Sequence, residues 1–298
     1  MDNNYNYANN NGQPPMQPGY GQPPMQPGYG QPMQPGYGQP MQPGYVQPNY
    51  NPNKPPKPIK LIDKLPTLDK IFIKQKKNIG EALTGCDLEN KYYVYKAAKN
   101  KEKKSGKKIY KVKEKSSCYA RVCLKMDCRP LDMKVYNQLN KDSDADDLCL
   151  FLSKPCTCTF LCCNRPTLNI YYKEDEKNEY LGKIMDPWEC CNYNFVVYDE
   201  TNTPIYKIIA NCCQCAFWCN GCPCKACEEA LIDVFDYNSK EKVAVMKKKS
   251  KNCCEQSIFD CGNYYVDFPN NATWKQKALL MSAALFIDYQ IFQQNDQN

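Results

Sequence analysis

Two clusters of cysteines carry most of the reactive side chains in this chain. The first contains Cys156, Cys158, Cys162 and Cys163, with Phe160 between them. Thiols beside apolar side chains near a membrane are suitable targets for S-acylation. Several acyl chains together give a stable membrane anchor where one chain would not. The sequence therefore predicts a lipid-anchoring segment here, and the alternative is that reduced cysteines pack as small apolar side chains.

The second cluster contains two CxxC pairs, Cys219 with Cys222 and Cys224 with Cys227. Four thiolates at this spacing could close a tetrahedral zinc or iron–sulfur site. Structural zinc pairs are usually separated by a longer loop, whereas a single proline stands between these two pairs. Zinc is therefore the less favoured interpretation, behind acylation or a plain cysteine-rich hairpin.

Two aromatic residues, Phe217 and Trp218, lie inside the second cluster. Tryptophan favours the interface between lipid and water, so the pair predicts a loop that contacts the membrane. Packing of both aromatic rings in the protein core is the alternative.

The cysteine content also bears on the cellular compartment. The chain has 21 cysteines and no histidine. Its first residues show no basic and apolar segment of a signal peptide, so we expect a cytosolic chain with reduced thiols. Without histidine, hydrolases that activate serine or cysteine through a histidine are excluded. We expect no covalent catalytic chemistry.

The net charge of +7 is carried almost entirely by lysine, since the chain has only three arginines. Bidentate recognition of bases and phosphates favours arginine, so no sequence-specific nucleic-acid partner is expected. A lysine-rich surface suits attraction to an anionic membrane leaflet, at about 1 kcal/mol per basic residue near the surface. A merely well-solvated surface is the alternative.

Residues 1–58 form a tail of tandem repeats rich in Pro, Gly, Gln and Tyr, beginning with GQPPMQPGY at Gly12–Tyr20. This composition prevents helices and sheet ladders, so the tail is predicted to be disordered. Its proline spacing offers polyproline ligands for SH3 or WW-type domains. A flexible spacer without a specific partner is the alternative.

The main domain is predicted over residues 59–293, followed by a disordered end at 294–298. Short segments rich in valine, isoleucine and tyrosine recur at regular intervals and are separated by turn residues, which indicates an all-β sandwich or barrel. The lysine-rich stretch 96–108 is predicted to be a long charged hairpin loop. One helix is predicted, at 274–292, and a closed sheet with one apolar helix suggests a helix threaded through a barrel.

The middle of that helix, Ala278 to Ile287, is apolar on every side. Such a helix must lie inside lipid or inside a protein core. Its apolar run is shorter than the about 20 residues that span a bilayer, which favours the core and leaves the spanning helix as the alternative. Asp288 then needs a partner, since an unpaired buried carboxylate is costly. Leu279, Leu280, Leu285 and Phe286 are the residues whose surroundings, protein core or lipid, distinguish a buried helix from a spanning one.

Several ordered segments across residues 59–293 resemble the phospholipid scramblase family. They are Leu83-Thr84-Gly85 with Asn90-Lys91-Tyr92, Gly106 before Ile109-Tyr110 and Glu114, Cys118 with Arg121 and Cys123, Arg129-Pro130, the first cysteine cluster, Leu181-Gly182 with Trp188, the cluster from Asn211 to Cys227, and Phe268-Pro269 before the helix with Asp288.

The resemblance implies a tubby-like fold, in which a closed antiparallel barrel of twelve strands surrounds the C-terminal helix. It implies calcium-stimulated, energy-independent movement of phospholipids between leaflets. It also supports palmitoylation of the first cysteine cluster, at the cytoplasmic face of a membrane, with the plasma membrane expected. The alternative is a non-catalytic, lipid-anchored adaptor that binds partners through its proline-rich tail.

The resemblance further implies a calcium-binding segment just before the terminal helix. The matching residues are Asp260, Asp267 and Asn271, with Gly262 where a carboxylate would be expected. Calcium prefers six to eight oxygen ligands, mostly carboxylates, so this set predicts a weak site. A turn and a strand leading into the helix are the alternative.

Overall fold

The computed structural model describes residues 60–76, 90–98, 101–115, 124, 128–139, 147–160, 162–174, 177–218, 225–249 and 263–292. The chain divides into two units, Met1–Pro55 and Pro56–Asn298, and every described residue belongs to the second. The predicted disordered segments at 1–58 and 294–298 therefore lie outside the described residues.

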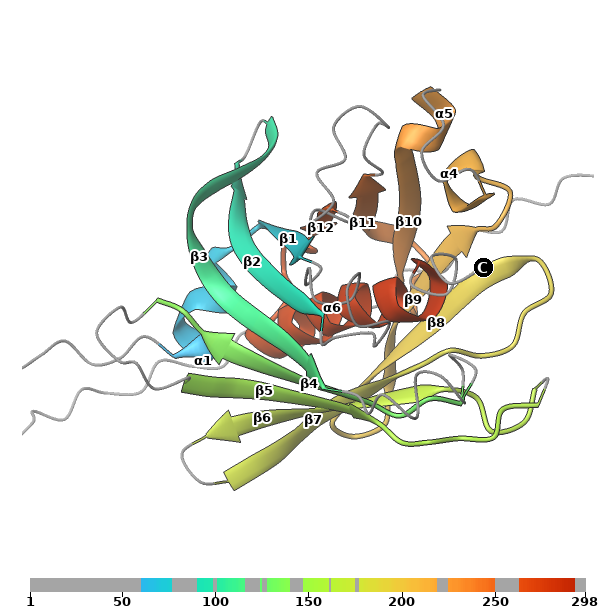
Figure 1. Cartoon of the computed structure of the whole chain (residues 1–298), viewed down its shortest axis with the longest axis horizontal. Helices are drawn as coiled ribbons and strands as arrows, with labels where there is room; N and C mark the ends of the chain where they lie inside the picture. The colour runs from blue at the N-terminus through green and yellow to red at the C-terminus, as the bar shows by residue number, and fades with distance from the viewer. Residues whose placement is uncertain are drawn as a thin grey trace, which may run out of the picture. The chain divides into compact units, whose positions relative to one another are not determined.

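Twelve antiparallel strands close into one barrel, in which each strand pairs with its neighbours in the sequence and β1 pairs with β12 (Figure 1). This confirms the predicted all-β class and the closed barrel. The strands are β1 (Lys70–Lys76), β2 (Lys91–Ala98), β3 (Lys101–Lys115), β4 (Leu131–Asn137), β5 (Asp147–Lys154), β6 (Thr167–Glu174), β7 (Lys177–Met185), β8 (Asn192–Asp199), β9 (Pro204–Asn211), β10 (Glu229–Asp236), β11 (Lys242–Lys249) and β12 (Asn263–Asp267).

The barrel follows from the alternation of side chains along its strands. In β4, Leu131, Met133 and Val135 are buried, while Asp132 and Lys134 between them are partly exposed. Successive side chains of a strand point to opposite faces, so this pattern fixes which face is inside. A shift of one residue in the pairing would turn the apolar set to solvent.

The barrel encloses the C-terminal helix α6 (Trp274–Ile287), which continues as one π-helical segment, η2 (Asp288–Phe292) (Figure 1). Thr273 caps the helix: its Oγ1 accepts from the amide of Gln276, and the Gln276 side chain accepts from the amide of Thr273. Every residue from Lys277 to Phe292 is buried. The helix is therefore buried on all sides, as its uniformly apolar sequence predicts, and the four deciding positions, Leu279 among them, face the barrel.

Among the described residues, no helix has the length and apolar character needed to cross a membrane.

The polar residues of the central helix have partners inside the barrel. The carboxylate of Asp288 accepts hydrogen bonds from the hydroxyls of Tyr92 (2.8 Å) and Tyr264, and it pairs with Lys248 Nζ at 3.0 Å. Near the other end, Lys277 Nζ donates to the carbonyl of Leu68 at 2.8 Å. A buried charge is tolerated where it is paired and hydrogen-bonded, so these contacts allow a helix with charged ends to enter an apolar barrel.

The charged hairpin loop predicted at 96–108 is wrong in most of its length. Strand β2 continues to Ala98 and β3 begins at Lys101, so the stretch lies within two strands that pair with each other, except for residues 99–100. The register of the pair shifts at three points, and Gly106 has φ +81°, a conformation that glycine adopts without a steric penalty. Irregular pairing with a glycine lets the lysine-rich segment stay in the ladder.

Four short helical segments were not predicted from the sequence. They are α1 (Leu61–Lys64), the 3-10 helix η1 (Leu65–Thr67), α4 (Cys215–Trp218) and α5 (Lys225–Glu228). Each is too short to show an apolar periodicity in the sequence. The first two place Leu61 and Leu65 against the core, beside the start of α6.

Candidate functional site

The barrel has two chemically different ends. Because consecutive strands are antiparallel, the connections that follow β5, β7 and β9 all lie at the same end, which we call the thiol end. The turns that follow β8 and β10 lie at the opposite end, which we call the turn end. Helix α6 begins at the turn end, after β12, and finishes at the thiol end, where Phe292 stacks on Phe217.

All twelve cysteines that the structure describes are free thiols. Only Cys149, a buried residue of β5, lies away from the thiol end. The cysteines in the connections or beside the strand ends of the thiol end are Cys128, Cys156, Cys158, Cys162, Cys163, Cys190, Cys191, Cys212, Cys213, Cys215 and Cys227.

The first cysteine cluster lies in the connection between β5 and β6. Phe160 and Cys163 exchange two backbone hydrogen bonds, of 3.2 and 2.8 Å, so the tip of this connection is a small hairpin. Asn164 follows with φ +49°, in the left-handed region that asparagine tolerates. The side chain of Phe160 is 72% exposed, and all four predicted acylation cysteines, including Cys156 and Cys158, are exposed. The hairpin therefore presents thiols and an apolar ring to the outside.

The connection between β7 and β8 brings two more thiols to the same end. Trp188 is 50% exposed, and Cys190 and Cys191 are both exposed. The base of this connection is tied to the first cluster, because Arg165 donates from Nε to the carbonyl of Asp186 at 2.8 Å and pairs with its carboxylate at 3.0 Å.

The connection between β9 and β10 contributes Cys212 and Cys213. Cys212 Sγ donates to the carbonyl of Cys191 at 2.6 Å, which continues the pairing of Asn192 with Asn211 by one more step. Cys213 is exposed. The β7–β8 and β9–β10 connections are thus in direct contact.

The aromatic pair predicted to contact the membrane has a different role in part. Phe217, on α4, is buried and packs on Phe292 and Tyr193, which is the core packing that the sequence left open. The side chain of Trp218 lies outside the described residues. Among the described residues at the surface of the thiol end, the exposed large apolar side chains are Phe160, Trp188 and Leu231.

The two CxxC pairs are mostly outside the part of the chain that the structure describes, since Cys219, Cys222 and Cys224 are not described. Cys227 is buried, and its sulfur lies 2.8 Å from that of Cys215. Within the described ranges, no three cysteine or carboxylate side chains are grouped closely enough to hold a metal ion.

The exposed thiols influence each other electrostatically. A hydrogen bond with Cys162 raises the pKa of Cys163, and a hydrogen bond with Cys190 raises the pKa of Cys191. Desolvation and the neighbouring Cys213 raise the pKa of Cys212. A raised pKa favours the protonated thiol over the reactive thiolate at Cys163, Cys191 and Cys212.

The turn end is polar in composition and contains no cysteine in its β8–β9 and β10–β11 turns. The Asp199 carboxylate accepts from Thr201 and Thr203, and the Asp236 carboxylate accepts from the amides that follow it. Hydrogen bonds with Thr201 and Thr203 keep the pKa of Asp199 below its usual value although desolvation opposes them. The exposed apolar side chains and thiols are thus concentrated at the other end.

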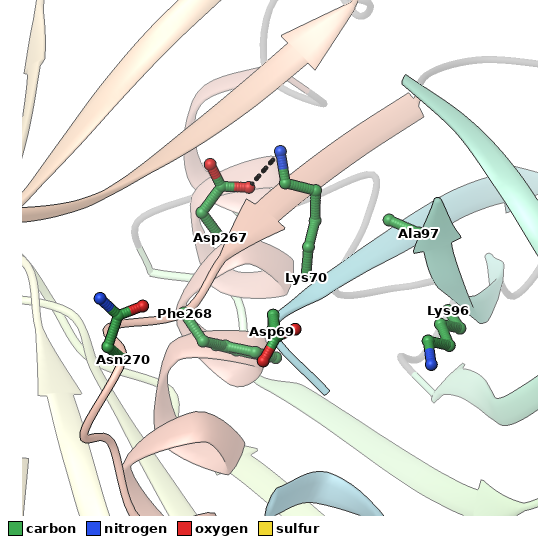
Figure 2. Close-up of a pocket in the computed structure, with 7 residues that line it drawn as sticks. All are labelled: Asp69, Lys70, Lys96, Ala97, Asp267, Phe268 and Asn270. Carbon is green, nitrogen blue, oxygen red and sulfur yellow. Dashed lines mark ion pairs between the residues drawn. The ribbon is translucent and has the colours of Figure 1, made fainter. Parts of the chain in front are cut away.

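The predicted calcium segment is an extended strand over Asn263–Asp267, as in the turn-and-strand alternative. Asp260 lies outside the described residues, and Asn271 lies in the turn before α6. The carboxylate of Asp267 pairs with Lys70 Nζ at 2.8 Å, at the edge of a pocket of about 220 Å³ that Asp69 and Phe268 also line (Figure 2). Because Asp260 is not described, the weak calcium site stays a prediction.

Sequence reasoning did not select Trp188, Cys190 and Cys191 as site residues. In the sequence, Trp188 contributes only to the family resemblance, and a cysteine pair beside one tryptophan is not a motif. The available signal was a large apolar residue next to two thiols in a segment between two predicted strands. Its significance appears only when the topology places this segment beside the first cluster.

A family model described as Scramblase matches residues 48–294. The chain is similar to phospholipid scramblase 1 of Rattus norvegicus, with 23% identity over 80% of this chain and 65% of the relative. It is similar to phospholipid scramblase 1 of Homo sapiens, with 25% identity over 78% of this chain and 65% of the relative. Phospholipid scramblase 2 of Bos taurus is 24% identical over 78% of this chain and 71% of the relative. No solved structure matches significantly.

Proposed function

The chain belongs to the scramblase family, and from this premise we propose that it moves phospholipids between the leaflets of a membrane without an energy source. Family membership supports a phospholipid scramblase function. The chain spans only about 65% of the length of the first relatives it matches, so the activity on this chain is our proposal. The observation that carries it is the extent of the family match, which includes the whole described barrel and its central helix.

We propose that the thiol end faces the cytoplasmic leaflet, at the plasma membrane. Support comes from the exposed Phe160 and the four exposed cysteines of the β5–β6 connection, whose tip is a preformed hairpin. Each acyl chain on these thiols would contribute about 0.8 kcal/mol per buried methylene. Lysines near the surface would add attraction to anionic lipids of about 1 kcal/mol each.

The path of the lipid in this proposal is along the outside of the barrel. Side chains of α6 and η2 occupy the barrel interior, and Phe286 packs there against Phe195 with ring centroids 5.8 Å apart. A lipid headgroup passing through the barrel would have to displace this core. Disturbance of the leaflet by acyl chains and exposed apolar residues at the thiol end requires no such displacement.

Calcium stimulation is part of the proposal and is supported by the family resemblance alone. Among the described residues, Lys70 holds the place beside Asp267 that a cation would take. No step of lipid movement is therefore derived through calcium. A calcium ion held on the segment that contains Asp260 would have to draw its other oxygen ligands from that segment.

The proposal predicts measurable lipid movement in a purified system. Full-length protein in liposomes that carry a fluorescent phospholipid should make inner-leaflet lipid accessible to dithionite faster than in protein-free liposomes, with a further increase on adding calcium. Magnesium at the same concentration is the control for divalent charge. No acceleration with or without calcium would contradict the scramblase proposal, and acceleration that calcium does not change would remove only calcium stimulation.

A second candidate function is a lipid-anchored adaptor without lipid-moving activity. The filled barrel favours the adaptor function, because side chains of α6 occupy the barrel interior. In this case the proline-rich repeats at 1–58 would bind SH3 or WW-type domains. A protein that is acylated, remains on membranes and fails the liposome assay would favour the adaptor.

The anchor itself predicts a second result. Replacing Cys156, Cys158, Cys162 and Cys163 by serine should strongly reduce the thioester-linked lipid that hydroxylamine releases from the cellular protein. Since all four side chains are exposed, the free energy of unfolding should change by no more than about 0.5 kcal/mol. The buried Cys149 is the matched control, since its replacement by serine should leave the released lipid unchanged. Unchanged lipid release after the fourfold replacement would contradict this anchor.

A further inference from the structure

We propose that Cys190 and Cys191 form a second S-acylation site, in which Trp188 places the β7–β8 connection at the lipid interface. The modification is a long-chain fatty acyl thioester. This inference rests on the proposed membrane contact of the thiol end and extends it to a separate connection of the barrel.

The first support is exposure. Trp188, Cys190 and Cys191 follow one another closely, and all three are exposed. A half-exposed tryptophan leaves a large apolar surface in water, and tryptophan gains by moving to the lipid–water interface. Glu189 lies between Trp188 and Cys190 in the sequence. Its carboxylate accepts hydrogen bonds from Asn194 at 2.6 Å and from Lys207 at 3.3 Å. Its carboxylate is therefore paired and does not stand alone against an anionic leaflet.

The second support is position. The β5–β6 and β7–β8 connections leave the barrel at the same end, and two hydrogen bonds from the Arg165 guanidinium to Asp186 join their bases. The pair is largely shielded, with side-chain exposures of 17% for both partners. Two connections fixed to one another in this way reach the same lipid surface together.

The third support is the neighbouring strand end. Cys212 donates to the carbonyl of Cys191, which fixes the backbone of the second site against the β9–β10 connection. Cys212 is only partly exposed and donates to a backbone carbonyl, whereas Cys190 and Cys191 are both exposed. The two adjacent thiols are therefore the acceptors, and Cys212 is a positioning residue.

The reaction is a thioester exchange with a long-chain acyl-coenzyme A as acyl donor. The cysteine sulfur bonds to the acyl carbonyl carbon, the bond from that carbon to the coenzyme A sulfur breaks, and the proton of the cysteine passes to the released coenzyme A thiolate. No oxidant or reductant takes part. The thiolate is the nucleophile, so a membrane-bound acyltransferase supplies the base that takes the thiol proton.

Two attachment points change how the barrel sits on a membrane. One acyl chain gives only marginal, reversible binding, and stable anchoring needs at least two signals. Chains on two connections of one rigid barrel also prevent it from pivoting about a single hairpin. The thiol end would then be held flat against the leaflet.

The test counts acylated thiols on the full chain expressed in cells, by replacing hydroxylamine-labile acyl groups with a maleimide mass tag. The fourfold serine variant of the first cluster should retain tagged species, up to two tags. Adding Cys190→Ser and Cys191→Ser should remove them. Loss of all tags in the fourfold variant would overturn the proposal, and so would tags that persist unchanged in the sixfold variant, because they would then lie on other cysteines.

A second measurement tests Trp188. Trp188→Ala in the fourfold variant should lower the remaining tagged fraction several-fold, while its thermal unfolding stays unchanged because the side chain is half exposed. Tyr237→Ala is the matched control, because this partly exposed aromatic residue lies in the β10–β11 turn at the opposite end of the barrel, and it should leave the tagged fraction unchanged. Equal tagging of Trp188→Ala and its parent would overturn the interfacial role of Trp188. Lipid movement in liposomes does not enter either measurement, so failure of the scramblase proposal would show separately.

Discussion

Replacing Leu285 by lysine is expected to unfold the barrel. Leu285 is 1% exposed, on the part of α6 that the strands surround. A lysine there must lose its proton or keep a charge in an apolar interior, and the pKa of a fully buried lysine can be lowered by up to about 3 to 5 units. Three units correspond to about 4 kcal/mol, before the lost leucine packing is counted. A domain with about 5 to 15 kcal/mol of stability would lose most of it. Urea unfolding followed by circular dichroism measures the loss.

Leu231→Lys is the control for this experiment. It makes the same chemical change on β10, where the side chain is 44% exposed, and should change stability by no more than about 0.5 kcal/mol. A Leu285→Lys protein that stays folded and soluble but leaves the membrane would contradict burial in the barrel. It would favour the alternative of a helix that spans the bilayer.

The sequence predicts the central helix well because one physical property decides its environment. Ala278 to Ile287 is apolar all round, so no face of this segment can meet water, and its shortness favours a protein core. The strands are predictable for a similar reason, as the alternation in Leu131–Asn137 shows. The closure into twelve strands was implied by the family resemblance, and the pairing of β1 with β12 confirms it.

Local composition misleads where the sheet overrides it. The lysine-rich stretch 96–108 has the composition of a solvated loop, yet it is paired over most of its length. Backbone hydrogen bonds to a neighbouring strand do not depend on side-chain polarity, and lysines can point outward from the ladder. The glycine at 106 permits the irregularity that keeps the pairing. None of these tertiary effects is visible in composition.

The sequence predicts the chemistry of the thiol end, but it does not predict which connections of the barrel form that end. The first cluster is recognisable because four thiols lie beside Phe160 in the sequence. The sequence left Phe217 open between membrane contact and core packing, and the deciding contact, its stacking on Phe292, joins residues 75 positions apart. Trp188 was not selected, because its nearness to the first cluster depends on two strands of intervening chain. Sequence spacing alone does not place the three connections together.

A buried charged residue lies near each end of the central helix, and each has a partner outside that helix. Lys277 is near the turn end, where its Nζ donates to the carbonyls of Pro66 and Leu68, and burial lowers its pKa. Asp288 is near the thiol end and pairs with Lys248. Each charge has a specific partner at its own end, so sliding the helix by one turn, about 5.4 Å, would break both sets of contacts. The helix position is therefore fixed along the barrel axis.

The close approach of that helix to the barrel wall gives the last prediction, at Gly182 of β7. Gly182 has φ +148°, and a Cβ there would lie 2.2 Å from the backbone carbonyl oxygen of Tyr198 and 3.2 Å from a methyl group of Leu279. An oxygen of the neighbouring strand cannot move aside as a side chain would. Gly182→Ala should therefore cost about 3 to 5 kcal/mol, from backbone strain and overpacking together.

Gly106→Ala separates the two causes, because Gly106 also has positive φ, +81°, but a Cβ there meets nothing within 4 Å. This control should cost only the backbone strain, about 1 to 2 kcal/mol. Chemical denaturation of both variants measures the difference, which isolates the contact of β7 with β8 and α6. Equal losses at the two positions would show that a Cβ at Gly182 meets no tighter surroundings than one at Gly106, and the close packing of β7 against β8 and α6 would be wrong there.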